Sequence, residues 1–273
     1  MGKISDALQK HNSEKQILAE KSPVDSERLI LEDPEISRIR DASLNWKVNP
    51  KLIVLSAPDS MDAENFKVLR AHVLMAGKKN SPPRTILVTS AFPGEGKTFV
   101  AANLAVSIAL GIDEYVLLVD CDLRRPQVHA MMGYSKSKGL GELLKGKMEV
   151  PDILIKTGIE KMSIITAGAP QKNPSELLSS SRMESFIEEV RSRYSDRFII
   201  LDATPAQFTS ESAVLARHVD GILLVVMANK TPREATKKVT QNLPKDKILG
   251  IVFNGHSESL KSYKKYYSGY YHK

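Results

Sequence analysis

The 273-residue chain is long enough for one large folded domain, and its 42% hydrophobic and 26% charged residues are typical of soluble globular proteins. This composition excludes a largely disordered chain and a bundle of membrane helices. The net charge of +7 would suit nucleic acid, anionic lipid or solubility. No nucleic-acid-binding module accompanies the charge, so we expect no nucleic-acid partner. The single cysteine, Cys121, excludes an internal disulfide and predicts a buried structural thiol.

Residues 1–50 form a polar, charge-rich N-terminal segment in which Ile4 and Leu8 recur at helical spacing. Two interpretations stay open: a frayed helix with a linker, and a docking helix for a partner. The segment lacks the apolar core of a signal peptide, and no apolar stretch of the sequence is long enough to cross a bilayer. We therefore expect a cytoplasmic protein with a folded domain over residues 51–257 and a tail over residues 258–273.

The hydrophobic pattern of the folded domain predicts an α/β fold. An apolar run over residues 52–55 predicts a first strand, and residues 62–75 follow the spacing of an amphipathic helix. Short apolar runs then alternate with helical patterns, which predicts a mostly parallel sheet covered by helices on both faces. Ligands of such sheets collect at the carboxyl ends of the strands. Six further strands are predicted over residues 85–89, 115–119, 162–166, 198–201, 222–226 and 248–253.

A phosphate-binding loop follows the first of these six strands. The stretch Ala91–Thr98 matches the pattern G-x-x-x-x-G-K-[ST] except that Ala91 replaces the first glycine. Its small residues let backbone N–H groups wrap phosphates, Lys97 meets the β and γ oxygens, and Thr98 offers a hydroxyl to Mg²⁺. We therefore predict a P-loop NTPase that binds ATP with Mg²⁺. The predicted nucleotide contacts are Pro93, Gly94, Glu95, Gly96, Lys97, Thr98 and Phe99, with Arg124 and Asn254 from later strand ends.

Two later strands end in carboxylates that can serve the same site. Asp120 and Asp122 lie two residues apart at a strand end, so they leave it on the same side and can reach Mg²⁺ or accept a hydroxyl proton. Asp122 could instead cap a helix before Arg124. Asp202 ends the next of these strands and is placed to hold the Mg²⁺ shell.

Two further residues have two interpretations each. Asn254 ends the last predicted strand, and its amide could read a base edge because it donates and accepts hydrogen bonds at once. A turn formed by Asn254 and Gly255 is the alternative. Arg124 could help to assemble the nucleotide site or could pair with an acidic neighbour.

Together these residues resemble the bacterial tyrosine kinases that regulate capsule and exopolysaccharide export, which are P-loop proteins related to the MinD and ParA ATPases. The resemblance covers about residues 50 to 273. Its specific elements are Pro93–Thr98 as Walker A, Asp120-x-Asp122-x-Arg124 as the second Walker A motif and Asp202 as Walker B. Its supporting elements are Gly139-Leu140, Asn173–Leu178 and the terminal tyrosine cluster. The opening stretch Lys3–Leu8 further resembles the exosortase-associated branch.

The resemblance implies an ATP-dependent protein-tyrosine autokinase. Lys97, Asp120, Asp122 and Asp202 would be its catalytic residues, and Thr98, Asp120 and Asp202 would hold Mg²⁺. The family also needs a membrane chain-length-determinant protein as its activator. Such a partner would place this chain peripherally at the inner face of the membrane.

The C-terminal tail carries five of the eight tyrosines of the chain. It has almost no aliphatic residues, so it cannot form a packed core and should be able to reach an active site, by preference that of a neighbouring subunit. An aromatic tail that binds a partner or lipid headgroups is the alternative. The predicted phosphoacceptors are Tyr263, Tyr266, Tyr267, Tyr270 and Tyr271.

Three positions depart from the pattern of the family. Ala91 replaces a P-loop glycine, and Thr204 stands where many relatives have the first of two prolines. The Glu-x-x-Arg-x-x-Arg oligomerisation motif appears as Glu64, Lys67 and Arg70, so an ammonium replaces a planar guanidinium. These three residues are the predicted interface of a homo-oligomer.

Two rival functions share the fold and the motifs. An ATPase switch of the MinD or ParA kind normally carries a signature lysine early in its P-loop, where this chain has Phe92. An ATP-binding assembly partner of a polysaccharide export complex would keep the motifs without kinase turnover.

Overall fold

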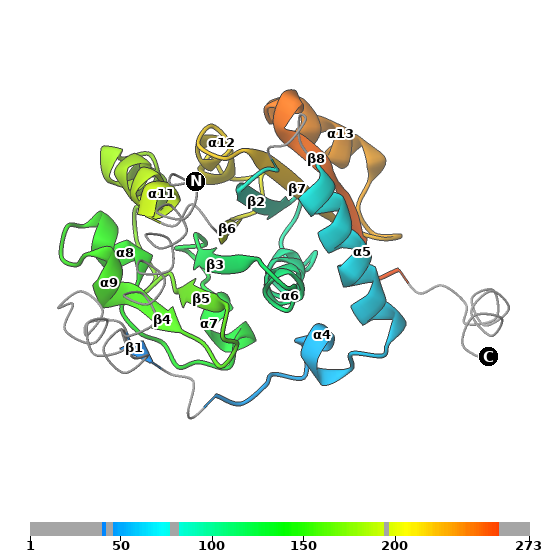
Figure 1. Ribbon diagram of the computed structural model, residues 1–273. Coiled ribbons are helices and arrows are strands. Elements are labelled where there is room, and N and C mark those ends of the chain that lie inside the picture. The colour runs from blue at the N-terminus through cyan, green and yellow to red at the C-terminus, as the bar shows by residue number, and fades with distance from the viewer. Residues whose placement is uncertain (1–39, 42–45, 77–81, 194–196, 257–273) are drawn as a thin grey trace, which may run out of the picture.

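The computed structural model describes residues 40–41, 46–76, 82–193 and 197–256, which form a single eight-stranded sheet with helices against it (Figure 1). The predicted N-terminal helix and the five predicted phosphoacceptor tyrosines lie outside the described residues. The strands are β1 (Arg40–Asp41), β2 (Thr85–Ser90), β3 (Tyr115–Asp120), β4 (Leu154–Lys156), β5 (Met162–Ile165), β6 (Arg197–Asp202), β7 (Gly221–Met227) and β8 (Ile248–Asn254).

The strands follow the order β1-β4-β5-β3-β6-β2-β7-β8 across the sheet. Along this order, every neighbouring pair in β5-β3-β6-β2-β7-β8 is parallel. The short strand β4 pairs antiparallel with β5. The six longer predicted strands are confirmed as β2, β3 and β5 to β8. Because β3, β6 and β2 are adjacent, their carboxyl ends bring the carboxylates and the phosphate loop to one edge of the sheet.

Helices cover both faces of the sheet, which confirms the predicted α/β architecture (Figure 1). One core packs the sheet against α4 to α7, and the other packs it against α8 to α13. The helices are α4 (Ile53–Ser56), α5 (Met61–Met75), α6 (Lys97–Ala109), α7 (Val128–Met131), α8 (Leu140–Leu144), α9 (Val150–Ile153), α10 (Pro174–Leu178), α11 (Ser181–Arg193), α12 (Glu211–Leu215) and α13 (Arg233–Asn242), with a short 3-10 turn at Lys245–Lys247.

Successive residues of the central strands enter opposite cores. In β2, Ile86 belongs to the core under α4 to α7, whereas Leu87 belongs to the core under α8 to α13. The same division separates Leu118 from Leu117 in β3. Side chains alternate across a strand, and both faces are covered, so both sets are apolar and fully buried.

One predicted strand is wrong. Residues 52–55 were expected to be extended, but Ile53–Ser56 form the helical turn α4. Val54 is buried there, and its N–H donates to the side-chain oxygen of Asn103 on α6 over 3.3 Å. Four apolar residues are too few to separate a strand from one helical turn, and tertiary contact with α6 decides between them. The helix predicted after them is confirmed as α5, which Ser60 caps by accepting from the Ala63 N–H.

Cys121 lies directly after β3 and is fully buried, as predicted. Its N–H donates to the carbonyl oxygen of Asp202 over 2.8 Å, and burial raises the pKa of its thiol well above the usual range. Between residues 40 and 256, outside the gaps in the description, none of the helices combines the length and the hydropathy needed to span a bilayer.

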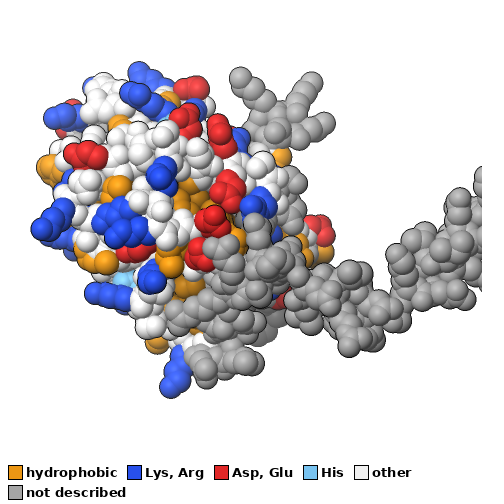
Figure 2. All heavy atoms as spheres, turned by 90° about the vertical axis from the view of Figure 1, so that its left-hand side faces the viewer, with side chains coloured by type: hydrophobic (Ala, Val, Ile, Leu, Met, Phe, Trp, Pro, Cys, Tyr) orange, Lys and Arg blue, Asp and Glu red, His pale blue; other side chains and the backbone are white. Residues whose placement is uncertain are grey.

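The surface charge of the described residues is mixed on the face that Figure 2 presents. There, lysine and arginine side chains alternate with aspartate and glutamate side chains over the helices at the β4 end of the sheet. Basic and acidic side chains are therefore interspersed on the visible, described part of this face.

Candidate active site

The loop between β2 and α6 adopts the conformation that a phosphate-binding loop needs. Gly94 and Gly96 have φ angles of +83° and +88°, which lie in the left-handed region that residues other than glycine rarely adopt. The helix that follows is rich in alanine and almost wholly buried, so its N-terminus is held rigidly at the edge of the sheet. Its partial positive charge faces the place where phosphate oxygens would lie.

The Glu95 side chain stabilises this loop from inside, and the predicted nucleotide contact of Glu95 stays a prediction. Its carboxylate is buried and accepts from the Phe92 N–H over 2.8 Å and from the Thr231 hydroxyl. The Asn254 amide donates to the Glu95 carbonyl oxygen over 2.8 Å. These contacts tie the loop to the ends of β7 and β8. Asn254 is the last residue of β8, and Gly255 follows it as a bend with a φ of +68°. Base reading by Asn254 and the alternative turn both stay predictions.

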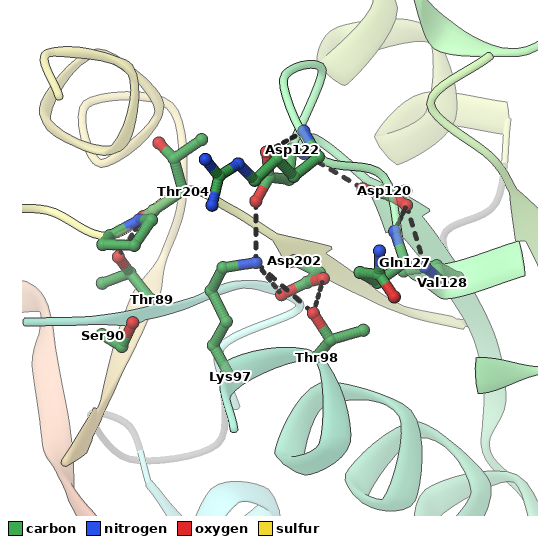
Figure 3. A network of polar contacts seen from close by, with 12 residues as sticks. Thr89, Ser90, Lys97, Thr98, Asp120, Asp122, Gln127, Val128, Asp202 and Thr204 are labelled. Carbon is green, nitrogen blue, oxygen red and sulfur yellow. Dashed lines mark hydrogen bonds and ion pairs between the residues drawn. The ribbon is translucent and has the colours of Figure 1, made fainter. Parts of the chain in front are cut away.

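The Lys97 ammonium is the central cation of the site and lies between the carboxylates of Asp122 and Asp202 (Figure 3). Its Nζ lies 3.0 Å from Asp122 Oδ2 and 3.5 Å from Asp202 Oδ1. Burial alone would lower the pKa of Lys97, but the charges of Asp202, Asp122 and Asp120 raise it above the usual value. Lys97 therefore stays an ammonium at neutral pH.

Thr98 and Asp202 form the second contact of the site. The Thr98 hydroxyl donates to Asp202 Oδ2 over 2.6 Å. The other oxygen of Asp202 is buried, accepts no hydrogen bond from the described residues and has Lys97 as its ionic neighbour. Burial raises the pKa of Asp202, while Lys97 and Thr98 oppose the increase. This hydroxyl and carboxylate are oxygen donors of the kind that Mg²⁺ prefers.

Asp120 is fully buried, and both of its carboxylate oxygens accept hydrogen bonds from backbone N–H groups (Figure 3). Its Oδ2 accepts from the N–H groups of Gln127 and Val128 over 3.0 and 2.9 Å, and its Oδ1 accepts from the Asp122 N–H over 3.1 Å. Burial, together with the charge of Asp202, raises the pKa of Asp120 to about 8. Asp120 therefore shapes the loop between β3 and α7, and its predicted roles in catalysis and metal binding stay predictions.

Asp122 caps a turn and not a helix, since the next helix, α7, begins only at Val128, and the predicted catalytic role of Asp122 stays a prediction. Its Oδ1 accepts from the Arg125 N–H over 2.9 Å, as a turn cap does, and its Oδ2 pairs with Lys97. Asp122 also lines the cavity above the P-loop, whereas Asp120 and Asp202 are fully buried and do not line it.

A cavity of about 860 Å³ opens over the P-loop, within the size range of ligand sites. It brings together most of the predicted nucleotide contacts with residues of the loops that follow β3 and β6. Its lining residues are Lys51, Pro93, Gly94, Gly96, Lys97, Thr98, Phe99, Asp122, Arg124, Arg125, Gln127, Met131, Thr204, Pro205, Phe208, Thr209 and Asn254.

Sequence reasoning missed Glu211, the acidic partner of Arg124. Arg124 Nη2 lies 2.8 Å from Glu211 Oε1, and the Glu211 side chain is fully buried. The two residues are far apart in the sequence, so no local pattern pairs them. A lone glutamate at the start of a short helix after the Walker B strand was the only available signal.

Phe92 occupies the place of the signature lysine of MinD-like ATPases, and its ring packs against Phe208. The two ring centroids lie 5.6 Å apart, and the Phe208 side chain is 64% exposed at the rim of the cavity. This end of the P-loop therefore carries a pair of aromatic rings in contact, where the ATPases carry an ammonium.

The three predicted interface residues lie on α5, but only two of them face outward together. Glu64 and Lys67 form an exposed ion pair of 2.9 Å. Arg70 instead donates to the Ser107 carbonyl oxygen over 2.8 Å and so fastens α5 to α6. A contact with a second subunit through these residues stays a prediction.

Comparison with known proteins first identifies the wider fold family. The ParA family model, described as NUBPL iron-transfer P-loop NTPase, matches residues 82–268. The septum site-determining protein MinD of Pyrococcus horikoshii OT3, complexed with Mg-ADP, is 25% identical and aligns with a TM-score of 0.54. That alignment covers 67% of this chain and 76% of the MinD chain. The chain is thus a nucleotide-binding P-loop NTPase, as predicted.

More similar proteins identify the branch. The tyrosine-protein kinase YwqD of Bacillus subtilis strain 168 is 31% identical over 227 residues, which cover 82% of this chain and 92% of YwqD. The putative tyrosine-protein kinase CapB of Staphylococcus aureus is 31% identical, over 80% of this chain and 95% of CapB. The kinase domain of the Escherichia coli tyrosine kinase ETK aligns with a TM-score of 0.68 at 31% identity, covering 78% of this chain and 84% of that domain. This chain belongs to the family of bacterial tyrosine-protein kinases.

Proposed function

We propose that this chain is an ATP-dependent protein-tyrosine kinase that phosphorylates its own C-terminal tyrosines in trans. By this reaction it regulates the polymerisation and export of an exopolysaccharide or capsule. The observation that carries the proposal is Lys97, which lies between Asp122 and Asp202 beside the P-loop cavity. The similarity to YwqD and CapB over most of their length supports tyrosine as the acceptor.

The contact between Thr98 and Asp202 fits an Mg²⁺ ion that arrives with ATP. The free lone pairs of Asp202 Oδ1 and the Thr98 hydroxyl offer oxygen ligands, directly or through water. Among the residues that the structure describes, no group of three His, Cys, Asp or Glu side chains is arranged to hold a metal. Phosphate oxygens and water would therefore complete the shell. Bound Mg²⁺ would neutralise charge on the β- and γ-phosphates.

In phosphoryl transfer, Lys97 would exchange its carboxylate partners for the phosphates of ATP. Phosphate oxygens would compete with Asp122 and Asp202 for the Lys97 ammonium and so release both carboxylates. Asp122 lines the cavity, and we assign to it the role of accepting the proton of the tyrosine hydroxyl. The tyrosine oxygen then bonds to the γ-phosphorus while the bond from that phosphorus to the β-γ bridging oxygen of ATP breaks, leaving ADP.

An ATPase switch of the MinD or ParA kind is the second candidate. The ParA family model and the fold of MinD favour it. Against it stands Phe92, which offers a ring packed on Phe208 instead of the signature ammonium. An ATP-binding assembly partner without turnover is the third candidate, and only a measurement of transfer separates it from the kinase.

Assembly and location follow from the same proposal. The kinase would form a homo-oligomer through α5, and the phosphorylated tail would loosen it by adding about −1.5 to −2 charges per phosphate. A membrane chain-length-determinant protein would activate it and hold it peripherally at the cytoplasmic face of the membrane.

The test mixes two variants with radiolabelled ATP and Mg²⁺. A Lys97→Met chain that retains its tail is combined with an otherwise intact chain that lacks residues 262–273, and phosphotyrosine is mapped by mass spectrometry. Phosphate on the tail of the Lys97→Met chain supports transfer in trans. Release of free phosphate without phosphotyrosine would favour the ATPase, and nucleotide binding with neither product would favour the assembly partner.

A further inference from the structure

Glu211 is a buried carboxylate whose contacts join three segments around the cavity. Its side chain is fully buried at the start of α12. Oε1 accepts from Arg124 Nε over 2.9 Å and from the Ser175 hydroxyl on α10 over 3.0 Å, and Oε2 accepts from the Thr204 hydroxyl over 2.9 Å. A buried carboxylate without such partners would be costly, so these hydrogen bonds hold the three segments together.

The partners of Glu211 belong to the loops that carry the site. Arg124 is two residues beyond Asp122, and Thr204 is two residues beyond Asp202. Arg124 and Thr204 both line the cavity. Figure 3 places Thr204 and Asp122 on neighbouring loops above Lys97. Glu211 therefore links the two loops from behind, while its own side chain stays out of the cavity.

The loop after β6 is fixed on its other side by two hydroxyl groups. The Thr204 carbonyl oxygen accepts from the Thr89 hydroxyl over 2.7 Å and from the Ser212 hydroxyl over 2.5 Å. Its hydroxyl also donates to Glu211, so both the backbone and the side chain of Thr204 are hydrogen-bonded. In contrast, the Arg124 side chain is 51% exposed and is fastened by the ion pair with Glu211.

We propose that Glu211 is a positioning residue for the phosphotransfer reaction, an inference that rests on the proposed function. It aims the Arg124 guanidinium into the cavity, where this cation binds the phosphates of ATP. An arginine held by a carboxylate along one edge keeps other N–H donors for phosphate oxygens. Glu211 thereby fixes the loop that carries Asp122 relative to the loop that follows Asp202.

Nucleotide affinity separates this role from a merely structural one. The affinity of the purified protein for a fluorescent ATP analogue is measured with Mg²⁺, together with thermal unfolding and steady-state phosphotransfer. We expect Glu211→Gln to weaken nucleotide binding by about 10-fold or more, because an amide cannot hold the guanidinium by charge. Glu211→Asp, which keeps the charge, should recover part of the affinity. The matched control is Glu142→Gln, a first-turn glutamate of α8 that accepts from the Gly139 N–H away from the cavity.

A double-mutant cycle identifies the residue through which Glu211 acts. Glu211→Gln in an Arg124→Met background should weaken nucleotide binding no further than Arg124→Met alone. Additive losses, or wild-type nucleotide affinity in Glu211→Gln with only a lower melting temperature, would overturn the proposal. If Glu211→Gln does not fold, Glu211→Asp and Arg124→Lys carry the same comparison, and wild-type affinity in both would overturn it. A wild-type protein that binds the analogue but makes no phosphotyrosine would refute the proposed function and leave this test in place.

Discussion

The Lys97 ammonium lies 3.0 Å from the Asp122 carboxylate, so the cation that would meet the γ-phosphate already has a counter-ion on a neighbouring loop. Phosphate binding therefore has to break this ion pair. The energy of nucleotide binding is in this way coupled to the release of a carboxylate beside the reacting atoms, and substitutions at either residue test the coupling.

Lys97→Met should abolish phosphotransfer and also reduce stability. Removing the ammonium should lower turnover by at least about 100-fold, while leaving two buried carboxylates without their cation should cost about 3 kcal/mol. The raised pKa of Lys97 means that its stabilisation is present below its unfolded pKa and is lost only as pH rises through the folded value. Phosphotyrosine blots and thermal melts at pH 7 measure both effects, with Lys238→Met on the exposed surface of α13 as control. Undiminished phosphotransfer would contradict the site.

Asp122→Asn should separate chemistry from nucleotide binding. Without the Asp122 charge, Asp202 is the remaining carboxylate paired with Lys97, so phosphate meets less competition. We therefore expect ATP affinity to be unchanged or tighter while kcat falls by about 100-fold. Steady-state kinetics with a tyrosine peptide give kcat, and equilibrium binding of a fluorescent ATP analogue gives the affinity. A variant that keeps its kcat would show that Asp122 only shapes the turn through Arg125.

Asp120→Asn should change the dependence of stability on pH. Because the pKa of Asp120 is raised to about 8, the folded state binds more protons than the unfolded state between the two pKa values, and the free energy of unfolding falls as pH rises through that window. Asparagine removes this component, so the slope between pH 5 and 8 should become shallower. It also lacks a second acceptor oxygen for the loop, which should lower stability at pH 5 by about 1 to 3 kcal/mol. Urea titrations across this range test both effects. An unaltered dependence of the free energy of unfolding on pH would contradict a raised pKa for Asp120.

Substitutions on α5 should distinguish a subunit contact from an internal one. Glu64→Ala with Lys67→Ala removes an exposed ion pair that contributes at most about 1 kcal/mol, so we expect a smaller oligomer in light scattering with little change in melting temperature. Arg70→Ala instead breaks the contact with Ser107 and should lower the melting temperature of the monomer. An unchanged mass in the Glu64→Ala, Lys67→Ala protein, at concentrations where wild type assembles, would exclude this face as the interface.

The parts of the fold that sequence could predict are those with a strong local pattern. The six longer strands are apolar runs bounded by turns, and the phosphate loop is defined by glycines whose left-handed φ angles few other residues adopt. The strand β4 was missed because its three residues follow a helical turn without a break in hydrophobicity. The turn α4 was predicted as a strand because four apolar residues carry no period.

The parts of the site that sequence could not predict depend on contacts between distant segments. Lys97 and Asp202 were placed together correctly because adjacent parallel strands end at one edge. The burial of Glu95, by contrast, depends on Thr231, and the pairing of Arg124 depends on Glu211. A charged residue in a loop looks the same in a sequence whether it faces water or a buried partner.

The burial of Cys121 gives this protein an internal reporter of opening. Its thiol is the only one in the chain, sits between the two aspartates at the end of β3 and is fully shielded, with a pKa raised by burial. A thiol reagent can reach it only when the centre of the sheet separates locally, so the rate of labelling measures how often that happens. Ligands that close the P-loop should slow the labelling, and the chain would thus report nucleotide occupancy without any added probe.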